Sequence, residues 1–239
     1  MPGLIKKEEF KDNCGFGLIA NINGVKSHKV IINSINALIS MTHRGGVGSD
    51  GKTGDGCGLL FDIDHKFFAD TVLKEQNIEI GEYFAIGQIF YHQDISKLLP
   101  KIKKIIKSEN LVLAAYRKVP VDEKILGEIA HSCMPEIFQL FIRPTEKDFN
   151  QDVFETGLIQ ARKYIEEIYM DDNKLYVCSM SSKTVVYKGL MLPNAIKEFY
   201  LDLNKENFRA STCVFHQRFS TNTSPRWHLA QPFRLLAHN

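Results

Sequence analysis

Cys14 is the residue of this sequence whose type and surroundings are best suited to covalent chemistry. It lies in the string Asn13-Cys14-Gly15-Phe16-Gly17, where the two glycines would let backbone or a substrate approach closely. If Cys14 became the first residue, its own α-amine, with an ordinary pKa of about 7.7, could act as base toward the thiol. The residues alone leave a second interpretation open, a small buried cysteine before a strand. The functional interpretation is a nucleophile that needs no separate histidine.

A second candidate segment, His43-Arg44-Gly45-Gly46, follows a stretch with helical spacing. Two interpretations of Arg44 are open. It could be one of the cations that offset the carbonyl end of a helix dipole. Alternatively, it could turn into a pocket to face a carboxylate, or hold the loop that does so.

Residues 45–58 contain seven glycines and predict a loop. Within it, the string from Gly46 to Thr53 matches the expression of a phosphate-binding loop literally. In such a loop a strand precedes and a helix follows, so that helix N–H groups cradle phosphate. Here a helical pattern precedes, and the glycines that follow disfavour a helix start. The order of elements therefore argues against nucleotide binding.

The segment from Phe215 to Thr223, FHQRFSTNT, places an arginine near a predicted strand end and hydroxyl and amide side chains just after it. The purely structural interpretation is a strand that ends in a polar turn. The functional interpretation is recognition of an α-amino acid, because a guanidinium fork suits a carboxylate and the Thr and Asn oxygens suit an amino group. Asn239 adds one more amide side chain, which alone indicates nothing.

The elements that must position these residues follow from hydrophobic periodicity. We expect a helix between Ser27 and Gly45 and others over 65–76, 94–108 and 153–169, with another opened by Pro193. Expected strands cover 15–22, 57–62, 83–91, 111–119, 137–142, 175–180, 184–190 and 212–219. Strands 175–180 and 184–190 suggest a hairpin. Strands in adjacent groups, separated by helices, favour antiparallel sheets layered with helices in a single domain.

Composition limits the function classes. The net charge is +2, and the basic residues are dispersed except for lysines on one face near 101–107, so no nucleic-acid or membrane partner is expected. No apolar stretch is long enough for a signal or a membrane span. The five cysteines contain no C-x-x-C pair, which argues against a metal site and against a disulfide framework. We expect a reducing, cytoplasmic setting that keeps a thiol usable.

These segments, in this order, resemble the class II glutamine amidotransferase domain that begins the large subunit of glutamate synthase. The matching strings are CGFGLIANI at 14–22, MTHRGGVGSDGKTGDGCGLL at 41–60 and FHQRFSTNTSPRWHLAQPFRLLAHN at 215–239. The resemblance runs throughout from Cys14 to the end. It implies an α+β fold, a four-layer αββα sandwich of antiparallel sheets of the N-terminal-nucleophile type, here incomplete at the C-terminus.

The resemblance also implies the roles of individual residues. Residues 1–13 would be a propeptide and 14–239 the N-terminal part of the amidotransferase domain. Once freed, Cys14 would attack the side-chain amide of L-glutamine, and its α-amine would carry the proton. The substrate's carboxylate and amine would be held by Arg218 with Thr221 and Asn222, and Arg44 would support the pocket. Asn239 matches the asparagine whose amide helps to form the oxyanion hole.

Two features of the family are expected to lie beyond this sequence. One is the glycine N–H that completes the oxyanion hole, together with a later acidic residue for the substrate's amine. The other is the region for FMN, an iron–sulfur cluster and the ammonia path, so no cofactor is expected in this chain. The remaining glutamate synthase domains and a small electron-donating subunit are the expected protein partners. The alternatives are another class II transfer, such as to a sugar phosphate, and an inert truncated or unprocessed domain.

Overall fold

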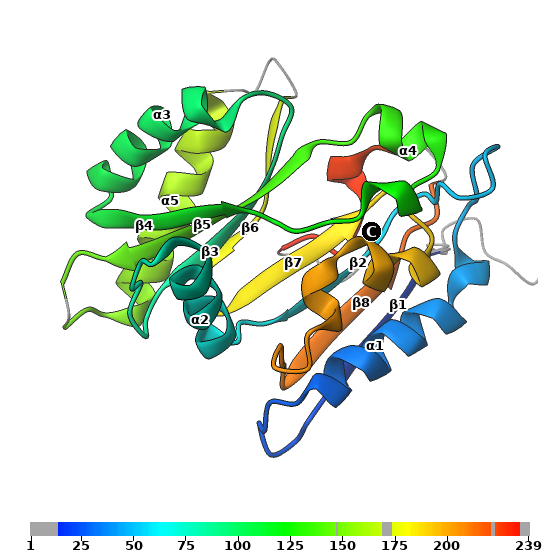
Figure 1. Cartoon of the computed structure of the whole chain (residues 1–239), viewed down its shortest axis with the longest axis horizontal. Helices are drawn as coiled ribbons and strands as arrows, with labels where there is room; N and C mark the ends of the chain where they lie inside the picture. Colours follow the sequence, from blue (N-terminus) through cyan, green and yellow to red (C-terminus); the bar gives the residue numbers. More distant parts are fainter. Residues whose placement is uncertain (1–13, 147, 169–173, 221–222, 235–239) are drawn as a thin grey trace, which may run out of the picture.

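The computed structural model describes residues 14–146, 148–168, 174–220 and 223–234. Its strands form two four-stranded antiparallel sheets (Figure 1). The first has the order β1-β8-β2-β7, from β1 (Gly15–Ala20), β8 (Thr212–Gln217), β2 (Cys57–Asp62) and β7 (Thr184–Gly189). The second has the order β4-β5-β3-β6, from β4 (Leu111–Lys118), β5 (Glu136–Pro144), β3 (Ala85–Tyr91) and β6 (Leu175–Ser181).

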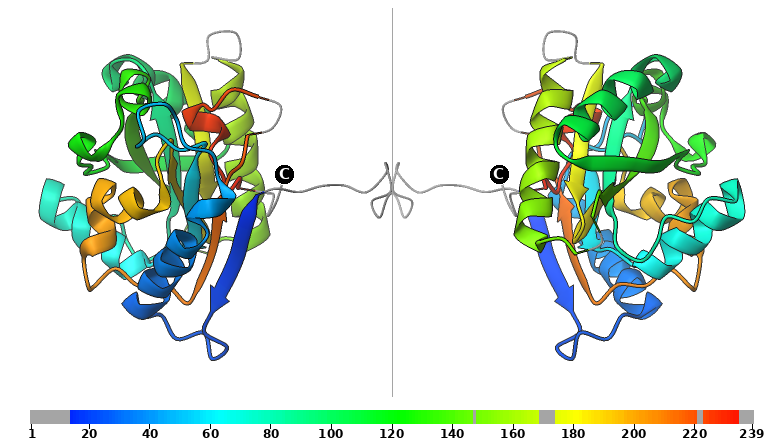
Figure 2. Two further views of the ribbon diagram at one scale, coloured as in Figure 1. Left: turned by 90° about the vertical axis from the view of Figure 1, so that its right-hand side faces the viewer. Right: turned by 90° about the vertical axis from the view of Figure 1, so that its left-hand side faces the viewer.

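Helices cover both sides of the strands. Helix α1 (His28–Ser40) packs on β1 and β8, whereas α3 (Ile95–Ser108) packs on β4 and α5 (Gln151–Glu167) on β6. Figure 2 shows α5 on the opposite side of the strands from α2 (His65–Gln76) and α6 (Ile196–Phe199). Two short elements complete the set that matters here, α4 (Glu128–Ser132) and the 3-10 turn η1 (Thr42–Arg44). The predicted α+β sandwich of antiparallel sheets and helices is confirmed.

The spacing of apolar residues explains why the long helices form where they do. The lysines of α3 are exposed. Its four buried side chains recur at helical spacing and are Leu98, Leu99, Ile102 and Ile106. Asp94 caps this helix by accepting the Ser96 N–H. These residues join a core beneath α3 and α5, and a second, larger core lies among α1, α2, α6 and the strands.

The predicted hairpin of residues 175–190 is wrong, because β6 and β7 belong to different sheets. The turn between them is held by α5, where the Glu155 carboxylate accepts the Ser182 N–H at 2.7 Å. The hydroxyl of Ser179 in β6 accepts the Val186 N–H of β7. This N–H is therefore bound by a side chain and not by a backbone oxygen of β6, as it would be in a hairpin. The chain therefore passes from one sheet to the other at this turn.

Among the other predicted elements, the boundaries moved by a few residues. The first helix ends at Ser40 and not at the glycines, because η1 tightens the chain before Gly45. The last predicted strand stops at Gln217. The loop that resembles a phosphate-binding motif folds back on itself through a bridge between Val47 and Gly54 and leads into β2, so no helix follows it.

Candidate active site

Cys14 lies immediately before β1, and its side chain is only 6% exposed. The pairing of β1 with β8 sets Gly15 opposite Gln217, so the residues that follow β8 come back beside Cys14. The Phe219 backbone N–H donates to the Cys14 sulfur at 3.4 Å. A donor directed at sulfur favours the thiolate over the thiol, and the thiolate is the nucleophilic form.

Arg218 lies one residue past β8 and is almost fully buried, with 7% of its surface exposed. Its guanidinium donates to the Asp55 backbone oxygen at 3.2 Å and to the Thr223 hydroxyl at 2.6 Å. Among the described residues, these two bonds use two of its five N–H donors, so others could bind a carboxylate. Burial lowers the pKa of Arg218 from its ordinary value, and the nearby Asp55 carboxylate opposes that shift.

The His43-Arg44-Gly45-Gly46 segment lies against the same ends of β1 and β8. The Arg44 side chain starts beside Gly15, where an added Cβ would come within 3.1 Å of the Arg44 Cβ. Arg44 itself is exposed. Gly45 is tighter still, because a Cβ there would lie 1.7 Å from the Gln217 side-chain nitrogen. The structure thus brings Arg44 next to Gly15, the neighbour of Cys14, and the absence of a side chain at Gly45 allows the close approach to Gln217.

Asp55 is a member of this site that sequence reasoning missed. Its carboxylate accepts the Ser220 N–H at 2.6 Å, and the neighbouring Gly56 oxygen accepts the Arg218 N–H at 2.8 Å. Gly56 has φ +119°, in the region that favours glycine, and an added Cβ would meet Ala230 at 2.7 Å. The available signal was an acid enclosed by glycines, Gly54-Asp55-Gly56, within a loop of no regular structure.

Lys188 in β7 is a second residue that was missed, and it is fully buried. Its ammonium donates to the backbone oxygens of His228 at 2.9 Å and Ala230 at 2.7 Å. It also lies over the ring of Tyr176, 4.7 Å from the ring centre. Burial lowers the pKa of Lys188 to about 8. This cation fixes the backbone of 228–230, which packs against Gly56.

Three predicted site residues, Thr221, Asn222 and Asn239, lie outside the described residues, as does the predicted propeptide 1–13. Of the candidates that the structure describes, Cys14, Arg44 and Arg218 are brought together at one end of the first sheet. The same end holds Asp55 and the Thr223 hydroxyl, so the described part of the site combines a cysteine thiol, a buried guanidinium and backbone donors.

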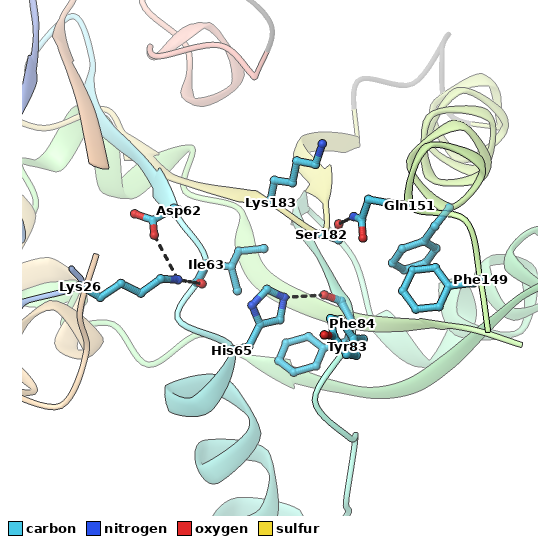
Figure 3. A pocket seen from close by; sticks show the side chains of 11 residues that line it. Lys26, Asp62, Ile63, His65, Tyr83, Phe84, Phe149, Gln151, Ser182 and Lys183 are labelled. Carbon is cyan, nitrogen blue, oxygen red and sulfur yellow. Dashed lines mark hydrogen bonds and ion pairs between the residues drawn. The ribbon is translucent and has the colours of Figure 1, made fainter. Parts of the chain in front are cut away.

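A cavity of about 370 Å³ opens at the other end of β2 (Figure 3). There Lys26 pairs with Asp62 at 3.1 Å, and the His65 ring nitrogen Nε2 donates to the Phe84 oxygen at 3.1 Å. Tyr83 forms part of its wall. The dashed lines in Figure 3 show that these polar groups bond to one another or to backbone. This cavity is separated from Cys14 by the length of β2.

Two features are absent from the residues that the structure describes. No group of three or more His, Cys, Asp or Glu side chains there is arranged to hold a metal ion. The described cysteines therefore offer no fit for an iron–sulfur cluster. In the same ranges, no helix is both long and apolar enough to cross a membrane.

A cysteine at the head of a strand, a buried arginine past the neighbouring strand and a sandwich of antiparallel sheets form the arrangement expected of an N-terminal-nucleophile amidohydrolase. The comparison with protein families agrees with this class: the model for class II glutamine amidotransferases matches residues 14–239. The chain belongs to this family.

Similar proteins are large chains of glutamate synthases. The chain is 40% identical over 234 residues to ferredoxin-dependent glutamate synthase 1, chloroplastic/mitochondrial, of Arabidopsis thaliana, covering 95% of this chain and 14% of that protein. It is 38% identical to glutamate synthase [NADH] of Saccharomyces cerevisiae, covering 99% of this chain and 12% of that protein. The glutamate synthase [NADPH] large chain of Azospirillum brasilense is 38% identical, with 97% and 16% covered. The chain thus spans about one seventh of these relatives' length.

Proposed function

We propose that this chain is the glutamine-hydrolysing part of a glutamate synthase, with Cys14 as the nucleophile. The observation that carries the proposal is the contact between the Cys14 sulfur and the Phe219 N–H, beside a buried Arg218 with unused donors. The similarity to the N-terminal regions of glutamate synthase large chains supports the same function.

The chemistry divides into two steps. The Cys14 thiolate attacks the side-chain carbonyl carbon of glutamine and forms a C–S bond. The C–N bond then breaks, and the nitrogen leaves as ammonia after taking the proton that the Cys14 α-amine received from the thiol. Water attacks the resulting glutamyl thioester, which releases glutamate and restores the thiol. Arg218 holds the substrate's α-carboxylate throughout, with Thr221 and Asn222 at its amine.

Removal of residues 1–13 is part of the proposal, because the α-amine of Cys14 is an amide until Asn13 is cleaved away. The resemblance assigns the oxyanion-stabilising amide to Asn239. We further propose a cytoplasmic enzyme that passes ammonia to 2-oxoglutarate. In it FMN, an iron–sulfur cluster and a small electron-donating subunit would act in parts of the enzyme other than this chain.

The proposal is tested by replacing Cys14→Ala in the full-length enzyme and measuring glutamate release from glutamine. We expect the hydrolysis to fall to background. Cys133→Ala is the matched control, because Cys133 is an exposed cysteine on α4's C-terminal side and should leave the rate unchanged. Glutamine hydrolysis that survives in Cys14→Ala would contradict the proposal.

A further inference from the structure

The glycine loop and the segment after β8 are joined by several bonds close to Cys14. The Ser220 N–H donates to the Asp55 carboxylate at 2.6 Å, and the Arg218 N–H donates to the Gly56 oxygen at 2.8 Å. The Arg218 guanidinium adds a third bond, to the Asp55 backbone oxygen at 3.2 Å. Residues 55–56 therefore hold both ends of the three-residue segment 218–220.

The middle residue of that segment is the one that reaches the nucleophile. The Phe219 N–H donates to the Cys14 sulfur at 3.4 Å, while the Phe219 side chain is partly exposed. The Phe219 backbone therefore depends on its two neighbours for its position. One of those neighbours is anchored by the backbone of Gly56, and the other by the Asp55 side chain.

The place of Asp55 is itself narrowly determined. Its N–H donates to the Gly46 oxygen at 3.3 Å, and a Cβ added at Gly46 would lie 2.6 Å from the Asp55 carboxylate. Gly46 of the string HRGG thus leaves room for the Asp55 carboxylate of the string TGDG. The Asp55 carboxylate and the Cys14 sulfur accept the N–H groups of consecutive residues, Ser220 and Phe219, and a negative charge near a thiol disfavours the thiolate.

We infer that Asp55 is a positioning residue: its carboxylate holds the Ser220 N–H so that the Phe219 N–H faces the sulfur of Cys14. This inference rests on the proposed function, because it assigns a supporting residue to that nucleophile. The donor stabilises the thiolate, and the geometric benefit exceeds the cost of the nearby charge. Asp55 acts through the backbone and does not touch the substrate.

The two effects of Asp55 have opposite signs, which makes the inference testable. Removal of the charge alone lowers the pKa of the Cys14 thiol, whereas loss of the N–H contact raises it. Asp55→Asn removes the charge but keeps an oxygen acceptor for Ser220. Asp55→Ala removes both. The thiol pKa should therefore rise in Asp55→Ala and stay equal or fall in Asp55→Asn.

The measurement is the rate at which iodoacetamide alkylates Cys14 in the processed full-length enzyme, followed across pH by peptide mass spectrometry. Asp55→Ala should raise the pH midpoint by half a unit or more and lower kcat for glutamine at least tenfold. Asp55→Asn should leave the midpoint equal or lower and retain kcat within about threefold. Asp50→Ala is the control in the same loop, because Asp50 bonds Thr53 and Ile129 and not the 218–220 segment.

A midpoint in Asp55→Ala that stays the same or falls would overturn the inference, as would an equal rise in Asp50→Ala. A diazoketone analogue of glutamine separates this outcome from failure of the proposed function. If the unsubstituted enzyme is not labelled by that analogue on Cys14, the proposed function fails, whatever the midpoints show. If it is labelled and the midpoints do not separate as stated, only the role of Asp55 is wrong.

Discussion

The two ends of β2 differ in how their charges are compensated. At the Asp62 end, Lys26 pairs with a carboxylate, and the Asp62 oxygens also accept the N–H groups of Ser211 and Thr212. At the Cys57 end, the buried Lys188 bonds to two backbone oxygens, and among the described residues no carboxylate forms an ion pair with it.

This difference agrees with the proposal that the Cys57 end carries the chemistry. The Asp62 end has a cavity, yet its polar groups are matched to one another, which is the arrangement that stabilises a fold. At the Cys57 end, burial lowers the pKa values of two cations, Arg218 beside Cys14 and Lys188 at the backbone of residues 228–230. Groups with pKa values shifted by burial concentrate at functional sites. Burial also lowers the pKa of His65 at the Asp62 end, so the two ends differ in how their charges are paired and not in whether pKa values are shifted.

The largest predicted effect is at the Cys57 end. Arg218→Ala should lower kcat/KM for glutamine about a thousandfold, or about 4 kcal/mol, because a substrate carboxylate would enter a buried site without its partner. Steady-state kinetics with glutamine would measure this. Arg209→Ala is the control from the other end, since Arg209 contacts Asp64 at 3.5 Å on a half-exposed surface. It should change kcat/KM less than about twofold. Similar losses of kcat/KM in both variants would contradict the assignment of glutamine binding to the Cys57 end.

The next effect concerns stability and pH. The folded-state pKa of Lys188 is lowered from 10.5 to about 8, so between these values the unfolded chain binds more protons. The free energy of unfolding should therefore rise with pH across that window, by about 3 kcal/mol in total from Lys188. Lys188→Met should lack this rise. Urea unfolding at pH 7 and at pH 10.5 would measure it.

A matched variant is available at the other end of β2. Lys26→Met removes the ion pair with Asp62 but leaves Lys188 in place, so it should keep the rise. The quantity to compare is the difference between each variant and the unsubstituted protein, because other titrating groups contribute equally to both. If the free energy of unfolding changed equally with pH in Lys188→Met and in the unsubstituted protein, the predicted contribution of Lys188 would be wrong.

The smallest effect is expected in the cavity at the Asp62 end. Tyr83 is 65% exposed there, and the polar groups around it are matched. Tyr83→Ala should change glutamine hydrolysis less than about twofold and the free energy of unfolding by less than about 0.5 kcal/mol. Hydrolysis assays and urea unfolding would measure both. A tenfold loss of hydrolysis would contradict this expectation and would mean that the cavity affects the reaction at Cys14.

The sequence predicted the elements whose signal is periodic and local. The buried positions of α3 and the strand β2 followed from apolar spacing, and the string around Cys14 indicated a nucleophile before a strand. The catalytic roles of Cys14 and Asn239, the substrate-binding roles of Arg44, Arg218, Thr221 and Asn222, and the removal of residues 1–13 stay predictions.

What the sequence did not predict depends on contacts between distant segments. Asp55 meets Ser220 across 165 positions, and this happens only because β8 lies beside β2. The sequence predicts Lys188 only as part of a strand. Its burial could not be predicted, because it depends on the path of the distant residues 228–230. The separation of β6 from β7 was missed for the same reason: the Glu155 carboxylate that holds their turn belongs to α5.

The central claim is that Cys14, freed at its amine, is the nucleophile. The most direct test is mass spectrometry of the active full-length enzyme after treatment with a diazoketone analogue of glutamine. We predict a chain that begins at Cys14 and carries one adduct on that residue, with activity lost in proportion to labelling. An active enzyme that still begins at Met1, or one inactivated with Cys14 unmodified, would contradict the account.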